Sequence, residues 1–519
     1  MGRIASLTER TTRALSFRFV GSLVDVGLSV TLSVILARLL PPEEFGLFGI
    51  TVSIIAIAEM LGSCGMLRAL VQRKILEPEH ESTAVIFQCS SAAVMSGLLF
   101  SGAPVTARLF EMSGLEVILR LQSAVLLVHA VTLLPESRLT RRLAFDRLVV
   151  IQTSSKVLGG GIAIVLAVSG FGAAALAIGS LVSEMTRLLL LWACAPGWIP
   201  LKFEMRHLRE LLSFGFGILL INISNTLAQR LDVLIVGRLI GSAGVGLYQR
   251  ATQLALLPLS HTTGSMNKVL FPVMSSVQDE YDRFRRGYLA TVRLSALLTF
   301  PALTALWTAA DIIIPFVYGP MWEGTVSLLQ IVAVAGFFRV LVNSHGLVIQ
   351  ARGQARAEAA RQVLWLIFVV IFGLIGSRAG VSGVAIGITL AAVIFCISMT
   401  RLALPIVGVS VIDWLNTMRT GLISSISMGV AIVLLKVLFQ EHLSTVLLLF
   451  TIVCAASAVY IAAVRICLSA EDIKLIESVG KVFSHRPQEV VRAILGIKLP
   501  GLDQEVQGKV GVNQVRPLR

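Results

Sequence analysis

Residues 34–51 read VILARLLPPEEFGLFGIT, and 200 positions later residues 234–251 read LIVGRLIGSAGVGLYQRA. The two stretches align without gaps and share Ile35/Ile235, Arg38/Arg238, Leu39/Leu239, Gly46/Gly246 and Leu47/Leu247. Similarity at a fixed offset predicts an internal repeat in which the second half of the fold copies the first. Six long apolar stretches separate the copies, an even number. We therefore expect two halves that point the same way, related by an axis along the membrane normal; chance similarity between two helix ends is the alternative.

Composition places this repeat in a membrane. Of 519 residues, 44 are Lys or Arg and 30 are Asp or Glu, so charged residues make up 14% and apolar residues 55%. Soluble domains have about 25% charged residues, and the mean hydropathy here is +0.84. Most soluble enzyme classes are excluded. The net charge of +14 comes from basic residues in short segments between apolar runs, which is how membrane proteins use them, so no nucleic-acid partner is expected.

Windows of about 19 residues predict fourteen spans. Their centres lie near residues 29, 55, 93, 126, 159, 182, 224, 259, 298, 338, 369, 391, 429 and 455. The predicted fold is an all-α polytopic membrane protein: a six-helix lobe over 1–200, a second over 201–402, two additional helices over 403–468, and a cytoplasmic tail over 469–519. Lys and Arg in alternate loops number 21 on one side and five on the other. Because positive loops resist translocation, both termini are predicted to be cytoplasmic.

No sequence pattern predicts bond-making chemistry. The six cysteines are scattered singly with no CxxC, so neither a disulfide framework nor a zinc site is indicated. GxxxxGK[ST], HExxH and GxSxG are all missing from the sequence. We therefore expect no enzyme activity, no cofactor and no metal.

Polar residues form stripes inside predicted spans. Arg18, Ser22, Asp25, Ser29 and Ser33 share one face of the first span, and Asn222, Asn225, Gln229 and Asp232 share one face of the seventh. The stripes superpose under the 200-residue offset, so equivalent helices are expected to face one cleft. Further spans add Arg250 with Gln253, and Arg339. A charge at mid-bilayer costs roughly 3 kcal/mol, which favours a functional role; mutual satisfaction in a sealed core is the alternative.

For other polar residues in apolar runs we expect structural roles, not functional ones. Glu59, Lys156 and Glu184 lie in or beside apolar runs, and snorkelling from span ends is the expectation for them. His129 and His345 could relay protons, but a single histidine in a helix is more often a hydrogen-bonded part of the packing.

Several motifs resemble one transporter family. They are ILARLLPPEEFGLFGI (35–50), GMLRALVQRK (65–74), LLSFGFGILLIN (211–222), VLIVGRLIGSAGVGLYQRATQLALLP (233–258), VLFPVMSS (269–276), YGPMWEG (318–324) and GVSGVAIG (380–387). In this order they look like the polysaccharide transporter family of oligosaccharide-lipid flippases, in the superfamily of multidrug and toxin extrusion proteins and lipid II flippases. The resemblance implies fourteen helices in two lobes. It also implies basic residues in the cleft, best matched by Arg250, with Arg18 and Asp25 plausible from their positions.

The resemblance further implies a function. The chain is expected to flip undecaprenyl-diphosphate-linked oligosaccharide repeat units across the bacterial inner membrane for exopolysaccharide, capsule or O-antigen (lipopolysaccharide) synthesis. Membrane lipids, a polysaccharide polymerase and export machinery are the expected partners. A cation-coupled multidrug exporter of the same fold and a membrane-embedded glycan polymerase or ligase are the alternatives. Substrate-binding candidates are Arg250, Arg18, Asp25, Asn222, Asn225, Gln229, Gln253 and Arg339.

Overall fold

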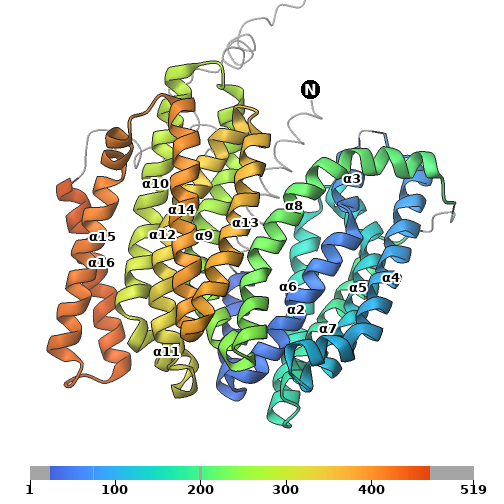
Figure 1. Ribbon diagram of the computed structural model, residues 1–519, viewed down its shortest axis with the longest axis horizontal. Helices are drawn as coiled ribbons and strands as arrows, with labels where there is room; N and C mark the ends of the chain where they lie inside the picture. The colour runs from blue at the N-terminus through green and yellow to red at the C-terminus, as the bar shows by residue number, and fades with distance from the viewer. Residues whose placement is uncertain (1–23, 74, 198–201, 468–519) are drawn as a thin grey trace, which may run out of the picture. The chain divides into compact units, whose positions relative to one another are not determined.

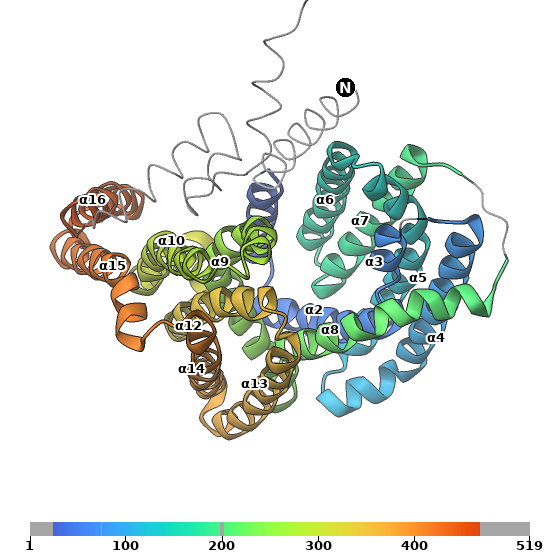
Figure 2. The same ribbon diagram turned by 90° about the horizontal axis from the view of Figure 1, so that it is seen from above.

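The structure, a computed structural model, describes residues 24–73, 75–197 and 202–467 (Figures 1 and 2). These residues form helices joined by short connections, and no strand occurs among them. They divide into two compact units. The first comprises the described residues up to Ala255, Ala309–Ala335 and Ala359–Phe395; the second comprises Leu256–Thr308, Gly336–Glu358 and the described residues from Cys396 onward.

A helix over residues 24–39 comes first among the described residues. It is followed by α2 (Pro42–Ser63), α3 (Met66–Gln72), α4 (Pro78–Phe110), α5 (Gly114–Arg141), α6 (Phe145–Val168), α7 (Ala173–Cys194), α8 (Met205–Leu239) and α9 (Ser242–Ser276). The rest are α10 (Tyr281–Thr308), α11 (Ala310–Tyr318), η1 (Pro320–Trp322), α12 (Thr325–Ala351), α13 (Ala355–Gly376), η2 (Ser377–Ala379), α14 (Gly380–Val407), α15 (Val411–Phe439) and α16 (Thr445–Cys467).

The helices confirm a multi-pass, all-α membrane protein. Within the described residues, 10 stretches are long and apolar enough to cross a membrane, and one of them, Arg356–Val407, covers most of α13 together with α14. Three other predicted spans coincide with the helix over 24–39, α8 and α9, which are not among the 10. The total of fourteen spans stays a prediction, as do the lobe boundaries at 200, 402 and 468.

The two copies of the repeat contact each other reciprocally. α2 and α9 begin 200 residues apart, and their first turns cross so closely that only glycine fits. A Cβ on Gly46 would collide with the carbonyl group of Ser242, and a Cβ on Gly246 would collide with the carbonyl group of Pro42. Under the offset, Gly46 corresponds to Gly246 and Pro42 to Ser242, so each contact is the symmetry equivalent of the other. Such reciprocity is the signature of a two-fold relation between equivalent segments.

A third contact places the local axis. Gly49 of α2 lies directly against the side chain of Gln249 of α9, and these two positions are equivalent under the offset. A position that contacts its own equivalent must lie beside the axis that relates the copies. The internal repeat expected from residues 34–51 and 234–251 is therefore present in three dimensions.

Small residues also hold α6 against α7. A Cβ on Gly159 would collide with the Gly179 carbonyl oxygen and with Ser183, and a Cβ on Gly179 would collide with Ala163 and with the Gly159 carbonyl oxygen. In lipid, apolar side chains gain no hydrophobic free energy by moving against another helix. Membrane helices therefore associate through close van der Waals packing, which small residues allow. The two helices lie side by side in both views (Figures 1 and 2).

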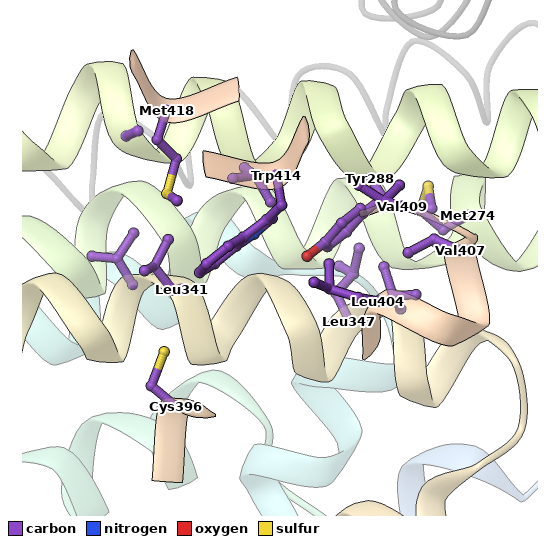
Figure 3. Close-up of a cluster of buried hydrophobic side chains, with 14 of the residues drawn as sticks. Met274, Tyr288, Leu341, Leu347, Cys396, Leu404, Val407, Val409, Trp414 and Met418 are labelled. Carbon is purple, nitrogen blue, oxygen red and sulfur yellow. The ribbon is translucent and has the colours of Figure 1, made fainter. Parts of the chain in front are cut away.

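The second unit has its own apolar core, to which α9, α10, α12, α14 and α15 all contribute (Figure 3). Its buried residues on α10 recur every four positions: Phe284, Tyr288, Val292, Ala296 and Phe300. This spacing gives one helical face. His345 of α12 lies in this core, with Nδ1 2.9 Å from Tyr288 Oη and Nε2 3.0 Å from Thr400 Oγ1. The hydrogen-bonded role expected of His345 is confirmed.

Candidate functional site

A polar cavity of about 360 Å³ opens among helices of the first unit. Its polar side chains are Glu59 and Ser63 of α2, Arg68 of α3, Gln88 of α4, His129, Thr132 and Glu136 of α5, and Arg187 of α7. α2, α4, α5 and α7 are all candidate membrane spans. Charged groups in such helices must be satisfied by protein or by water in a cavity, because hydrocarbon offers no hydrogen bonds.

Four ionisable side chains that line this cavity form a connected network with Glu184 of α7, here called the α2–α5–α7 network. The imidazole of His129 bridges two acids: its Nδ1 is 2.9 Å from Glu59 Oε1 and its Nε2 is 3.0 Å from Glu184 Oε2. The guanidinium of Arg187 also bridges two acids, at 3.2 Å from Glu184 and 2.8 Å from Glu136. Ion pairs between these side chains thereby connect α2, α5 and α7.

The network is accessible from the cavity. The exposed fraction of its side chains runs from 22% for His129 to 41% for Glu59. The side chains are therefore neither sealed in a core nor on an outer surface. Two carboxylates, two guanidinium groups and one imidazole line the cavity, so it can hydrogen-bond hydroxyl groups as donor and as acceptor.

Snorkelling, the sequence-based expectation for Glu59 and Glu184, is wrong. Both side chains are ion-paired with His129 inside the first unit. His129 is hydrogen-bonded as expected, but its partners are ionised groups, not neutral packing neighbours. A signal was available: His129 and Glu136 lie two turns apart on one helix, and Glu184 and Arg187 lie one turn apart on another. Charges recurring in three nearby apolar runs predict mutual pairing.

Arg250 of α9 lies in an aromatic enclosure. Its guanidinium carbon is 4.1 Å from the Phe45 ring centre and 5.8 Å from the ring centres of Tyr318 and Trp322. Only 7% of the residue is exposed. A desolvated guanidinium over such rings gains about 2 kcal/mol from the ring quadrupoles.

Hydrogen bonds fix the direction of this guanidinium. Arg250 Nη1 donates to Ser33 Oγ at 2.5 Å and to Gln253 Oε1 at 3.0 Å. The structure therefore brings together two predicted site residues, Arg250 and Gln253. It places beside them Ser33, which belongs to the polar stripe of the first predicted span. The rings around them come from α2 and from the YGPMW segment at 318–322, whose role the sequence patterns did not indicate.

Asp25, another predicted site residue, pairs with α6. Lys156 Nζ lies 2.7 Å from Asp25 Oδ1 and 3.2 Å from Ser29 Oγ. Both charged side chains are partly exposed, at 32% and 26% for Lys156 and Asp25. Lys156 does not snorkel as expected, because it is anchored to the first-span stripe. Arg18, proposed to act beside Asp25, lies outside the described residues.

The remaining predicted site residues are on α8 and α12. Gln229 is exposed on α8. Asn222 and Asn225 lie on the same helix, but their side chains are outside the described part of the structure. Arg339 of α12 lies in the second unit, where its side chain is half-buried. A common cleft for all eight residues stays a prediction.

Comparison with known families decides the classification. The model of the family described as "Polysaccharide biosynthesis protein" matches residues 35–327, more than half of the chain. The chain belongs to this family. The match includes the repeat, the α2–α5–α7 network and the Arg250 enclosure.

Relatives of this polysaccharide biosynthesis family member come from several bacteria. It is 27% identical over 300 residues to the teichuronic acid biosynthesis protein TuaB of Bacillus subtilis, covering 57% of this chain and 62% of TuaB. It is 25% identical to the lipopolysaccharide biosynthesis protein WzxC of Escherichia coli, covering 75% and 80% of the two chains. It is 26% identical to the succinoglycan biosynthesis transport protein ExoT of Rhizobium meliloti, covering 63% and 66%.

Solved structures show the same fold. The lipid II flippase MurJ in an inward closed conformation matches with a TM-score of 0.70 and 15% identity, over 86% of this chain and 97% of MurJ. An inward-facing multidrug resistance transporter of the MATE family matches with a TM-score of 0.59 and 18% identity, over 74% and 94%. At these identities the likeness concerns the fold, and the all-α polytopic membrane class expected from the sequence is confirmed.

Proposed function

We propose that this protein flips undecaprenyl-diphosphate-linked oligosaccharide units from the cytoplasmic to the periplasmic leaflet of a bacterial inner membrane, for exopolysaccharide, capsule or O-antigen assembly. The observation that carries the proposal is family membership over residues 35–327, the family of polysaccharide biosynthesis proteins. The names of TuaB, WzxC and ExoT, each tied to synthesis or transport of a surface polysaccharide, support it.

The geometry of the first unit is suited to this task. A flippase must shelter a polar glycan and a diphosphate from hydrocarbon while the polyprenyl chain stays in lipid. A hydrophilic cavity among apolar helices offers such shelter, and carboxylates and amides such as Glu59 and Gln88 can bond sugar hydroxyl groups. Outward movement of negative charge is favoured by about 2.3 kcal/mol per charge per 100 mV of inside-negative potential.

Binding of the diphosphate is proposed for arginine. Arg250 Nη1 donates to both Ser33 and Gln253. An arginine fork matches phosphate oxygens in a bidentate way, which lysine cannot do. In this proposal phosphate oxygens replace those two neutral acceptors during transport, while Phe45 keeps the guanidinium in place. Asp25, Arg18, Asn222, Asn225, Gln229 and Arg339 complete the proposed substrate-binding set.

The sidedness of the protein is part of the proposal. Both termini and the loops after Arg142 and Arg361 are proposed to be cytoplasmic, because Lys and Arg concentrate in those loops. Reporter fusions after these two residues should show cytoplasmic activity, and a fusion at Gly170 should show periplasmic activity. Inverted activity after any span contradicts the proposed count of fourteen.

The acid-rich network supports a second candidate, a cation-coupled exporter of organic cations. Within the network, the carboxylates of Glu59, Glu136 and Glu184 outnumber the guanidinium of Arg187. Such a site attracts cationic drugs as well as protons. This candidate predicts that expression protects a drug-sensitive host from cationic dyes. The flippase proposal predicts no such protection.

The deciding experiment is flipping of lipid-linked sugar in vesicles. Full-length protein is reconstituted with undecaprenyl-diphosphate-linked oligosaccharide, and the fraction accessible to an added lectin is followed with time. Protein-dependent exposure that excess free lipid-linked sugar slows, and an organic cation leaves unchanged, supports the flippase. Inhibition by the organic cation alone supports the exporter. We propose no covalent step, so the oligosaccharide should be recovered with its mass unchanged.

A further inference from the structure

A second cluster of ionisable side chains lies away from the cavity, where the first turns of α4 and α8 meet. Glu77 is the N-cap of α4, and His80 is in its first turn. Glu204 is the N-cap of α8, and His207 is in its first turn. Each helix thus begins with the same pattern, Glu-x-x-His, which the sequence shows as EPEH and EMRH.

The three atoms that could hold a metal ion converge. Glu77 Oε2 lies 3.7 Å from His80 Nδ1 and 3.5 Å from His207 Nε2, and all three ligand atoms are within 4.8 Å of one another. Bond lengths of about 2.0–2.1 Å in a tetrahedral zinc site place neighbouring ligand atoms about 3.4 Å apart. Two of the three separations are therefore within a few tenths of an ångström of those in a zinc site.

The other nitrogen of each imidazole faces a carboxylate. His80 Nε2 hydrogen-bonds Glu210 Oε2 at 3.3 Å, and His207 Nδ1 lies 3.3 Å from Glu204 Oε2 without the alignment of a hydrogen bond. A histidine that binds a metal through one nitrogen almost always donates its other N–H to such an acceptor. Glu210 is in turn held by Arg73 at 2.5 Å, so this outer carboxylate is fixed.

Without a cation beside it, the His207 ring is poorly satisfied. A neutral imidazole has one lone pair. At His80 this lone pair, on Nδ1, accepts the Glu77 backbone N–H at 3.4 Å, a weak bond that a metal ion would replace, whereas at His207 a carboxylate faces each ring nitrogen. The buried Nδ1 atom of His207 makes no hydrogen bond, and its side chain is 91% buried, since 9% is exposed. The two rings lie close together, with a centroid separation of 4.1 Å. A metal ion bound to Nε2 of His207 resolves the conflict at that ring, because Nδ1 then carries the hydrogen and faces Glu204.

Independent contacts hold the two helix starts together. Ser82 Oγ donates to the Lys202 carbonyl oxygen at 2.7 Å, and the Glu204 N–H donates to Thr83 Oγ1 at 3.2 Å. The backbones of the two helix starts are therefore held together without the side chains of Glu77, His80 and His207. Glu77 is 56% exposed, which leaves one side of the cluster open to water as a fourth ligand and to the arriving ion.

We propose that Glu77, His80 and His207 bind one divalent transition-metal ion, with zinc the best fit, and that this ion joins the start of α4 to the start of α8. Two imidazoles, one carboxylate and a water form a donor set that zinc accepts. Magnesium and calcium prefer oxygen donors, so neither should compete. Because α8 begins the second predicted half of the chain, the ion would fasten the connection between the halves.

Metal content of the purified full-length protein tests the proposal. The protein is prepared in detergent with a tag free of histidine and cysteine, stripped with a chelator, given ZnCl₂, and passed through metal-free buffer. We expect about one zinc per chain, and Co²⁺ in its place should give the visible absorption of a four-coordinate ion. His207→Asn and Glu77→Gln should each weaken zinc binding by more than about 100-fold, and Glu204→Gln by about 10–100-fold.

Matched controls separate this site from others. His442→Asn removes an exposed histidine of the α15–α16 connection and should leave zinc binding unchanged. Glu77→Gln changes a largely exposed side chain, so its fold should survive even where a histidine variant does not. The proposal is overturned if the wild type retains no zinc, if Glu77→Gln binds as tightly as the wild type, or if alkylating the cysteines abolishes binding.

Discussion

Replacing Gly46 by alanine tests the reciprocal contact between the repeat copies. An added Cβ would collide with the backbone carbonyl group of Ser242, and a backbone atom cannot rotate away as a side chain can. Overpacking of this kind costs about 1–3 kcal/mol. A Gly→Ala change within a helix otherwise gains about 1 kcal/mol. We expect Gly46→Ala to lower the free energy of unfolding by up to about 2 kcal/mol.

Gly161→Ala is the matched control. Gly161 lies in α6, and nothing stands within 4 Å of a Cβ placed there. The control should keep the gain of about 1 kcal/mol, so the two variants should differ by about 1–3 kcal/mol, or about 5–150-fold in the unfolding equilibrium. Unfolding in mixed detergent micelles, followed by the fluorescence of the six tryptophans, measures this difference. Equal stability of the two variants would refute the reciprocal contact.

The double variant Gly46→Ala/Gly246→Ala examines the two-fold relation itself. The two collisions lie in one interface, and a small separation of α2 from α9 relieves both. Neighbouring substitutions that share a backbone shift are non-additive. The second substitution should therefore cost less than the first. Strict additivity would show that the two contacts are independent.

Three further changes address transport and the tail. Arg250→Ala should abolish polymer export at unchanged membrane abundance, with Arg250→Lys retaining part of it; disappearance of the protein from the membrane would instead assign Arg250 to packing in its aromatic enclosure. Asp25→Asn should lower export by leaving Lys156 unpaired, and Lys156→Gln in addition should restore part of it; full activity of the single variant removes Asp25 from the mechanism. Deletion after Leu468 should leave export intact, since residues 469–519 follow the last predicted span; loss of export at normal protein level argues against a dispensable tail.

Periodic and repeated features were predictable from the sequence. Apolar runs of about 20 residues predict membrane helices because few other segments can cross hydrocarbon. The offset of 200 residues likewise predicts the two-fold relation that the reciprocal contacts Gly46–Ser242 and Gly246–Pro42 display. These features are encoded in local patterns.

Pairings between distant helices were not predictable in the same way. The face of a helix can be read from its own spacing, but its neighbour cannot, and Glu59 depends on His129 seventy residues later. Lys156 and Asp25 are 131 residues apart, and neither helix indicates the other. The Glu-x-x-His pattern at Glu77 and at Glu204 gives no sign that the two helix starts meet.

The α2–α5–α7 network has a consequence for biosynthesis. All of its members precede residue 195, and Arg187 is the last to leave the ribosome. Every charge in it can therefore find its partner before α8 is translated, and the first helices can enter the membrane without waiting for the rest of the chain. Arg250 is different, because Tyr318 and Trp322 are made later. For roughly 4–14 s at ordinary elongation rates, this arginine must rely on Ser33, Phe45 and Gln253, which makes early docking of α9 on α2 a condition for burying its charge during membrane insertion.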